Sequence, residues 1–433
     1  MDILESLHVM QRIYQAVGIT QLKHERKSYQ LLRSRPLEIY SVCIMISSLV
    51  ALFYRLFFCS EDFYETNNNN NNNHNHNQRH VNMNVYVIQL IGICAAQIVS
   101  IVEAISRRNE ERRFFEKVRE IDSMFEYSLN INVENRLFRR KTLLRGSIML
   151  VLYMSSKLFT LTTLFGLSQL HLFLLLLGYL LPFMACTIRY LQIFTAFTII
   201  KCRLDILISL INQVNLCQDH FISFHRRVDE TPVLWKTPNI SVNELAVRKN
   251  CPLDMENPQM KQLLILRDLY DRLWFTTCVV NRCFGFSILL NVGNDFLSII
   301  SNFYWLFLNT NDSHSESSKL IPIIIWNLPH LCNLWVLSVL CNRTLKSTIN
   351  IALAIHRMKI DNSNDNHNTV VMKYIHIEQF SLQLLHQNII FTAAEFFKVD
   401  STLLYKIIGA ATTYLIILIQ IFSGLKAGSF PTT

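Results

Sequence analysis

The sequence is poor in charge. Asp, Glu, Lys and Arg make up only 17% of its 433 residues, against about 25% in soluble domains. The charges that are present are crowded into a few segments, and the long stretches between them offer water almost nothing to solvate. Because residues of the AVILMFWYC set reach 51%, this composition excludes a chain of two or three soluble domains.

Several functional signatures are also missing. No Gly-rich phosphate loop, metal-ligand spacing or nucleophile–base set occurs, so we expect no enzyme, cofactor or metal centre. No basic run is interleaved with stacking aromatics, so the net charge of +9 does not predict a nucleic-acid partner. The 11 cysteines are odd in number and nearly all lie in apolar or basic segments, which argues against a disulfide-rich secreted domain.

What the sequence does contain is a series of apolar runs. Crossing about 30 Å of hydrocarbon takes about 20 residues of helix. Seven runs are long enough, near 39–59, 83–105, 148–167, 172–198, 273–308, 321–342 and 402–423. As a helix the fifth would be about 54 Å long, and we expect it to extend past the bilayer at its charged end, from Arg267 to Arg282. The sequence therefore predicts an all-α integral membrane protein with seven transmembrane helices.

The distribution of basic residues predicts the orientation of these helices, because Lys and Arg near span ends are retained in the cytoplasm. Segments 1–38, 106–147, 199–272 and 343–401 carry 33 Lys and Arg, and segments 60–82, 168–171 and 309–320 carry 2. We therefore expect the N-terminus inside the cell and the C-terminus outside, the reverse of a G-protein-coupled receptor. The first residues also lack the basic and apolar regions of a signal peptide.

The segments between the spans differ in character. The low-complexity Asn/His tract from Asn67 to His80 is predicted to be a disordered outer loop instead of a metal site. Segments 106–147 and 372–392 alternate apolar and polar positions as amphipathic helices do. We expect these two inner segments to pack into a cytoplasmic base together with the overhang of the fifth span.

The C-terminal span carries a motif. Thr413 and Tyr414 are followed by five apolar residues and then Gln420. This resembles the insect gustatory receptor family, whose last span carries Thr-Tyr, five apolar residues and Gln-Phe. Ile421 stands where the family has Phe, and Glu395 stands where a small residue is usual.

The resemblance implies a ligand-gated, non-selective cation channel that detects small-molecule tastants. Such channels are homotetramers or heterotetramers with other gustatory receptor subunits, in the plasma membrane of sensory neurons. It also implies three regions: 1–343 with helices 1–6 and the ligand site, a cytoplasmic loop 344–401 with an amphipathic helix, and 402–433 with the pore helix and a short extracellular tail.

The predicted pore residues lie on that last helix: Thr413, Tyr414, Leu418, Gln420 and Ile421. A ring of Gln420 amides would replace part of a cation's hydration, although an interhelical hydrogen bond accounts for the amide equally simply. Tyr414 is expected to pack between helices more than to line the path. Asp400 precedes the helix and is predicted to cap its free N–H groups.

Candidate ligand contacts lie in the outer halves of the spans. They are Tyr86, Tyr179, Asp295, Tyr304, Trp305, Trp326 and Asn327, and the same span halves also contain the polar residues Gln89, His171 and Asn302. Trp and Tyr near span ends are commonly interfacial anchors, so each aromatic has that simpler explanation. Asp295 is different because a carboxylate within a span is costly and is usually paired or functional. Lys157 and Arg189 are its candidate partners.

Alternatives remain open at this point. A G-protein-coupled receptor would also have seven spans, but Asp-Arg-Tyr after the third and Asn-Pro-x-x-Tyr in the seventh are missing. An odorant-receptor-like channel subunit would share the inverted topology. Leu415 follows Tyr414 where the family's sugar branch is commonly acidic, which favours bitter or aversive tastants. Of the three glycosylation sequons, at Asn239, Asn311 and Asn342, only Asn311 lies in a segment predicted to be outside.

Overall fold

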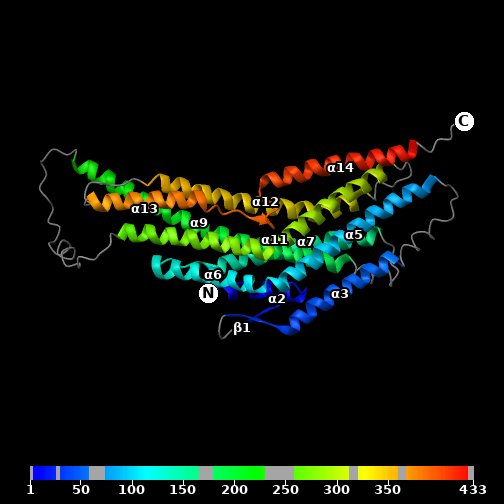
Figure 1. The fold of residues 1–433 in the computed structure, drawn as a ribbon, viewed down its shortest axis with the longest axis horizontal. Coiled ribbons are helices and arrows are strands. Elements are labelled where there is room, and N and C mark those ends of the chain that lie inside the picture. The colour runs from blue at the N-terminus through cyan, green and yellow to red at the C-terminus, as the bar shows by residue number, and fades with distance from the viewer. Residues whose placement is uncertain are drawn as a thin grey trace.

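A computed structural model describes residues 3–25, 30–57, 74–164, 179–229, 258–311, 320–358 and 367–427. These residues form a bundle of long helices that run along one axis (Figure 1). The helices are α1 Ile3–Ser6, α2 His8–Ala16, α3 Arg35–Phe57, α5 His74–Ser106, α6 Arg108–Leu129, α7 Asn135–Leu164, α9 Leu181–Asp229, α11 Pro258–Asn311, α12 Leu320–His356, α13 His367–His386 and α14 Ser401–Ala427. Two small antiparallel hairpins complete the described part, β1 Leu22–Glu25 with β2 Gln30–Arg33 and β3 Thr392–Ala393 with β4 Phe397–Lys398.

Five helices among the described residues are long and apolar enough to cross a membrane, namely α3, α5, α11, α12 and α14. The third and fourth expected spans, 148–167 and 172–198, correspond to parts of α7 and α9. Residues 165–178 between those helices lie outside the described residues. The all-helical architecture is as expected from the apolar runs.

The Asn/His tract differs from expectation in its second half. α5 begins at His74, so the backbone from His74 to His80 is helical and not a loop. Backbone hydrogen bonding continues beyond the apolar run that defines the span, and hydropathy does not register that continuation. The first half of the tract lies outside the described residues.

At one end of the molecule α6 and α13 lie on either side of α11 and form a base with the ends of the long helices there (Figure 1). α9 has 49 residues and α11 has 54, and both exceed the roughly 20 that a bilayer requires. Arg272 of α11 forms an ion pair with Glu120 of α6, and Arg267 donates to Gln379 of α13 at 2.8 Å. The expected overhang of the fifth span is therefore present, and it packs as predicted.

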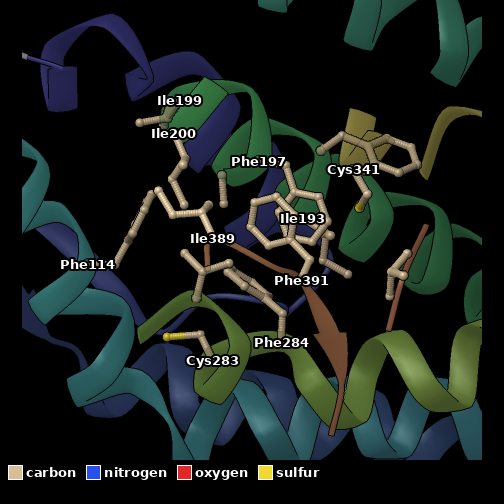
Figure 2. Packing of buried hydrophobic residues seen from close by; sticks show 14 of the residues in the cluster. Phe114, Ile193, Phe197, Ile199, Ile200, Cys283, Phe284, Cys341, Ile389 and Phe391 are labelled. Carbon is tan, nitrogen blue, oxygen red and sulfur yellow. The ribbon is translucent and has the colours of Figure 1, made fainter. Parts of the chain in front are cut away.

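A short hairpin joins this base to the last helix. Phe391, just before β3, stacks on Phe197 of α9 with ring centroids 3.7 Å apart, within the apolar core that Figure 2 shows between α9 and α11. The turn between β3 and β4 places Ala394 and Glu395 at φ of 48° and 66°. Ala393 and Phe397 are the last paired residues, so the loop has three residues. The two consecutive positive φ values, with a hydrogen bond of 3.0 Å from the Phe396 N–H to the Ala393 carbonyl, give its tight reversal.

The hairpin rests on α11. The Asn281 side chain donates to the Ile390 carbonyl at 2.9 Å and accepts from the Thr392 N–H at 3.2 Å. One turn further along α11, a Cβ on Gly285 would lie 2.9 Å from the Ala394 nitrogen. Glycine is therefore required there, because only a missing side chain lets the two backbones approach so closely.

The start of α14 lies just after the hairpin that packs on α11 and is capped by Asp400. The Asp400 carboxylate accepts from the Thr402 N–H at 2.9 Å and from the Leu403 N–H at 3.3 Å. The predicted N-cap is thus confirmed. The free N–H groups of Thr402 and Leu403 near the helix start are satisfied. The Thr402 hydroxyl also donates to the carboxylate at 2.6 Å, and this bond, followed by the two N–H bonds, lowers the pKa of the Asp400 carboxyl. α14 begins only two residues after a hairpin that is fixed to α11.

Candidate functional site

The last helix contacts the rest of the chain through one narrow face. Within its apolar segment Ser401–Ile421, only 11% of the most apolar stretch is buried in the chain. The packed face includes Ile407 and Ala411, which belong to the main core. Positions spaced four, three and four residues apart fall on one side of an α-helix. A row with that spacing is exposed on the opposite side, and it holds the polar residues Thr413 and Gln420 together with Gly409 and Ile416.

The five predicted pore residues differ in their contacts within the chain. Thr413, Tyr414, Gln420 and Ile421 are exposed in the single chain. The ring of Tyr414 also meets that of Phe296 on α11 edge-on, with centroids 6.0 Å apart. Leu418 is half-buried against the cluster of Val85, Tyr304 and Leu308.

A second group of predicted residues surrounds a buried charge pair in the bundle. Asp295 of α11 lies 2.8 Å from Nδ1 of His330 on α12, and it accepts from the Tyr190 hydroxyl at 2.7 Å. The Lys157 ammonium of α7 lies 3.2 Å from Nε2 of the same imidazole. It also donates to the Trp326 carbonyl at 3.1 Å. Four helices therefore meet in one network, which we call the outer cluster: Lys157, Tyr190, Asp295, Trp326 and His330.

One imidazole tautomer satisfies both of its neighbours. An ammonium can only donate, so Nε2 of His330 accepts from Lys157. Nδ1 then carries the hydrogen and donates to Asp295. Lys157 is accordingly a partner of Asp295 as predicted, but through His330 in place of direct contact. Pro329 precedes His330 inside α12 and provides no backbone N–H.

Aromatic rings enclose the Lys157 ammonium. It lies 3.8 Å from the ring centroid of Trp326 and 4.6 Å from that of Phe183. Tyr179 stacks on Trp326 with centroids 5.0 Å apart, and its ring is 5.8 Å from the ammonium. Cation–π attraction of this kind offsets part of the cost of burying a charge.

The remaining ligand candidates lie elsewhere. Asn327 accepts from the Asn302 amide at 3.0 Å, and the Asn302 oxygen accepts from Gln89 at 3.5 Å. Tyr304 is buried and its ring is 6.4 Å from that of Trp305. The structure thus separates the predicted set into the outer cluster and a neighbouring row of amides and aromatics. Tyr86 and Asn311 lie in helical backbone without described side chains, and His171 is outside the described residues.

A second buried charge pair is formed by Glu103 and Arg189. Together with Gln192 and Ser287 we call it the inner cluster. Arg189 donates to Glu103 at 3.1 Å, to Gln192 at 2.8 Å and to Ser287 at 2.9 Å. Its Nη2 also donates to the Cys283 carbonyl at 3.1 Å. The prediction that Arg189 pairs with Asp295 is therefore wrong, because Glu103 on α5 takes that place.

Glu103 binds the backbone of α11 as well as Arg189. Its two carboxylate oxygens accept from the N–H groups of Phe286 and Ser287, each at 2.9 Å. The Ser287 hydroxyl also donates to it. These contacts flank Gly285, where the hairpin before α14 rests on α11.

The inner cluster continues toward the N-terminal segment. Gln192 donates to Glu111 of α6 at 2.7 Å, and the Thr20 hydroxyl donates to the same carboxylate at 3.4 Å. Burial of the Glu111 carboxyl raises its pKa from 4.5 to about 7, against the opposing effects of Arg189 and these hydrogen bonds.

Sequence reasoning did not identify His330 or Glu103. Both had a signal. His330 follows Trp326 by four residues and so shares its helix face, and Glu103 is an acidic residue inside an expected span, which is costly without a partner.

Comparison with known proteins bears on the arrangement as a whole. Residues 7–422 match the family described as 7tm chemosensory receptor. The chain belongs to this family. It is 35% identical to gustatory receptor 2a of Drosophila melanogaster, over 97% of this chain and 96% of that protein. It is also 28% identical to gustatory receptor 23a of the same species, over 47% of this chain and 54% of that protein.

The fold has solved counterparts. The olfactory receptor OR5 of Machilis hrabei in complex with eugenol superimposes with a TM-score of 0.60, at 12% identity, over 97% of this chain and 100% of that chain. This chemosensory receptor is thus a multi-pass membrane protein with the helical fold of an insect olfactory receptor. Its family is one of receptors and not of enzymes.

Proposed function

We propose that this receptor is a subunit of a ligand-gated, non-selective cation channel that detects small-molecule tastants. The subunits form a homotetramer or a heterotetramer with other gustatory receptor subunits in the plasma membrane of sensory neurons. The observation that carries this proposal is the last helix, because a 21-residue apolar segment with only 11% of its window buried leaves most of its surface for partners, lipid or a pore.

The polar row on α14 supports the location of the permeation path. Thr413 and Gln420 lie on the side opposite the packed residues, and polar groups within spans usually face protein or water. Four Gln420 amides around an axis would provide dipoles that replace part of a cation's hydration shell. Apolar positions between them, Leu415 to Leu418, would block the closed path by dewetting.

The tastant binds in the outer half of the bundle, near the outer cluster. Aromatic surface with a few polar groups is the usual form of a small-molecule site, and the rings of Trp326 and Tyr179 lie beside buried polar side chains there. The contact of the hairpin with α11, which carries Asp295 of the outer cluster, offers a route from that region to the start of α14. Ligand binding must favour the open state to have any effect on the pore.

Bitter or aversive compounds are the proposed tastants. Leu415 follows Tyr414, where the sugar branch commonly has an acidic residue. The region around the outer cluster also offers more aromatic than hydrogen-bonding surface, and a sugar would leave hydroxyls unpaired at roughly 1–3 kcal/mol each.

Current recording in otherwise unresponsive cells tests the proposal. Expression of the receptor, alone or with partner subunits, should give tastant-evoked cation currents that persist when G-protein signalling is blocked. Gln420→Ala should lower conductance, and Gln420→Glu should raise the relative permeability of divalent cations. Gln383→Ala, which removes an amide that donates to Gln387 just after the end of α13, is the matched control. Currents that vanish with G-protein block would contradict the channel and favour a G-protein-coupled receptor.

The orientation has a separate test. Sugar on Asn311, and none on Asn239 or Asn342, is expected from the proposed topology. Glycosidase treatment of the expressed protein and its sequon variants measures this directly, and sugar on Asn342 would reverse the orientation. The likeness to an olfactory receptor solved with eugenol favours one second candidate, an odorant-receptor-like channel subunit that responds to volatile aromatics.

A further inference from the structure

Both carboxylate oxygens of Asp295 in the outer cluster already accept a hydrogen bond. One accepts from the Tyr190 hydroxyl at 2.7 Å and the other from His330 at 2.8 Å. The imidazole stands between the carboxylate and Lys157. A ligand donor that approached Asp295 would have to compete with one of these two donors for a side chain that is buried.

Lys157 is in the opposite situation. An ammonium has three donors, and two of them bond to the Trp326 carbonyl and to His330 at 3.1 and 3.2 Å. One donor remains among the described contacts, on a side chain that is 0% exposed. The ring of Trp326 lies 3.8 Å from the same ammonium, so an apolar or aromatic surface adjoins the remaining donor.

A second donor group lies on the same face of α7. Tyr153 precedes Lys157 by four residues, a spacing that places two side chains next to each other on a helix. Its side chain is 4% exposed and packs in one cluster with Tyr179, Phe183 and Trp326. Its hydroxyl has no hydrogen-bond partner among the described residues, and a buried hydroxyl without a partner is unfavourable.

From this inventory we infer that the site takes a ligand with an apolar or aromatic body and a hydrogen-bond-accepting group, a carboxylate above all, held by Lys157 and Tyr153. Both side chains donate, while the carboxylate of the cluster is already occupied. An amine is disfavoured, because Lys157 fills the aromatic cage and a second cation would be repelled. This inference rests on the proposed function, since it assigns a chemical class to the same ligand site.

Three probes of nearly equal size test the inference: 3-phenylpropanoic acid, its primary amide and 3-phenylpropylamine. They are applied to the purified full chain in lipid nanodiscs, with binding followed by quenching of tryptophan fluorescence, and to expressing cells, with currents recorded. We expect the acid to bind about tenfold or more tighter than the amine, with the amide between them, since hydrogen bonds to charged groups are stronger than those between neutral groups.

The variants separate the two donors. Lys157→Met should weaken binding of the acid about tenfold or more and change binding of the amide less, so that the preference is lost. Tyr153→Phe, which removes only the hydroxyl, should weaken the acid and the amide alike by a few fold and keeps the inference testable if Lys157→Met does not fold. Lys201→Met, which removes a half-buried lysine paired with Asp205 on α9, is the matched control and should leave the binding of all three probes unchanged.

Binding and current together distinguish the two levels of the proposal. Acid-selective binding without any current would contradict the channel function and leave the ligand class standing. Equal binding of amine and acid, an acid preference that survives Lys157→Met, or no binding of any probe at millimolar concentration by folded protein would overturn the inference.

Discussion

The outer and inner clusters both bury a basic and an acidic side chain and share the helices α9 and α11, yet they are built in opposite ways. In the outer cluster an imidazole separates Lys157 from Asp295, and the neighbouring Tyr153 hydroxyl is unpaired among the described residues. In the inner cluster Arg189 and Glu103 are in direct contact.

The inner pair also uses its hydrogen-bonding capacity more completely. Arg189 donates to side chains on two helices and to the Cys283 carbonyl, and both oxygens of Glu103 bind N–H groups of α11. A network in which every member is satisfied holds one geometry, whereas a network with spare donors can accept another group. We infer that the fully bonded inner pair fixes the helix packing, whereas the outer pair, which keeps a spare donor, is able to bind another group.

The largest expected effect is on the inner pair. Arg189→Met leaves Glu103 buried and uncompensated, and removal of one partner of a buried pair costs about 3–5 kcal/mol. We expect a large loss of folded protein at the cell surface and a lower thermal midpoint of the purified protein. Lys157→Met should cost less, because Asp295 keeps Tyr190 and His330 as donors. Equal losses in the two variants would remove the distinction between the clusters.

The pH dependence of stability tests Glu111, which is linked to the inner cluster through Gln192. The folded chain holds a proton on Glu111 up to about pH 7, whereas the unfolded chain releases it near 4.5. The folded state therefore binds the extra proton, and the stability of the wild type falls as pH rises between these two values. It is constant above them.

Glu111→Gln should remove this slope, because its amide oxygen can still accept from Gln192. Relative to the wild type, the variant should gain up to about 3 kcal/mol between pH 4.5 and 8. Arg189, Tyr14 and Cys283 also face Glu111 electrostatically. Thermal unfolding across this pH range provides the measurement, and Glu116→Gln, in an exposed pair with Arg112, should leave the slope unchanged.

The contact of α11 with the hairpin gives a smaller effect. Gly285→Ala would place a methyl 2.9 Å from the Ala394 nitrogen, and overpacking against backbone costs about 1–3 kcal/mol. Gly293→Ala on the same helix is the matched control, since nothing lies within 4 Å of its Cβ position. It should stabilise by up to about 1 kcal/mol. Thermal midpoints measure both, and a destabilised Gly293→Ala with a neutral Gly285→Ala would contradict the close approach.

The smallest expected effect concerns the cap of α14. Asp400→Ala removes the acceptor for the Thr402 and Leu403 N–H groups and should cost about 1 kcal/mol. Asp400→Asn retains an acceptor and should behave almost as the wild type. Comparison of their thermal midpoints shows whether the inner end of the last helix is as closely specified as the inner cluster.

Hydropathy was sufficient to predict the helical class and the long fifth span, because burial in lipid requires long uninterrupted apolar runs, and the alternation of apolar and polar residues predicted the base. Neither pattern predicted that α5 extends back to His74, since that part of the helix is rich in Asn and His. Candidate site residues were chosen one at a time by type, so Asp295 and Trp326 were named as separate candidates. The bridge formed by His330 depends on how four helices are placed, and no pattern in one segment contains that information.

The position of Lys157 has a mechanical consequence for α12. Pro329 cannot complete the backbone ladder there, so the helix is more easily bent at this place than elsewhere. Lys157 forms hydrogen bonds with the Trp326 carbonyl before the proline and with the His330 imidazole after it. It therefore connects the two parts of α12 that Pro329 separates. Any change in the bend angle of α12 must lengthen or shorten one of these two bonds. A molecule that binds the Lys157 ammonium and displaces it would therefore change the angle between the two halves of α12.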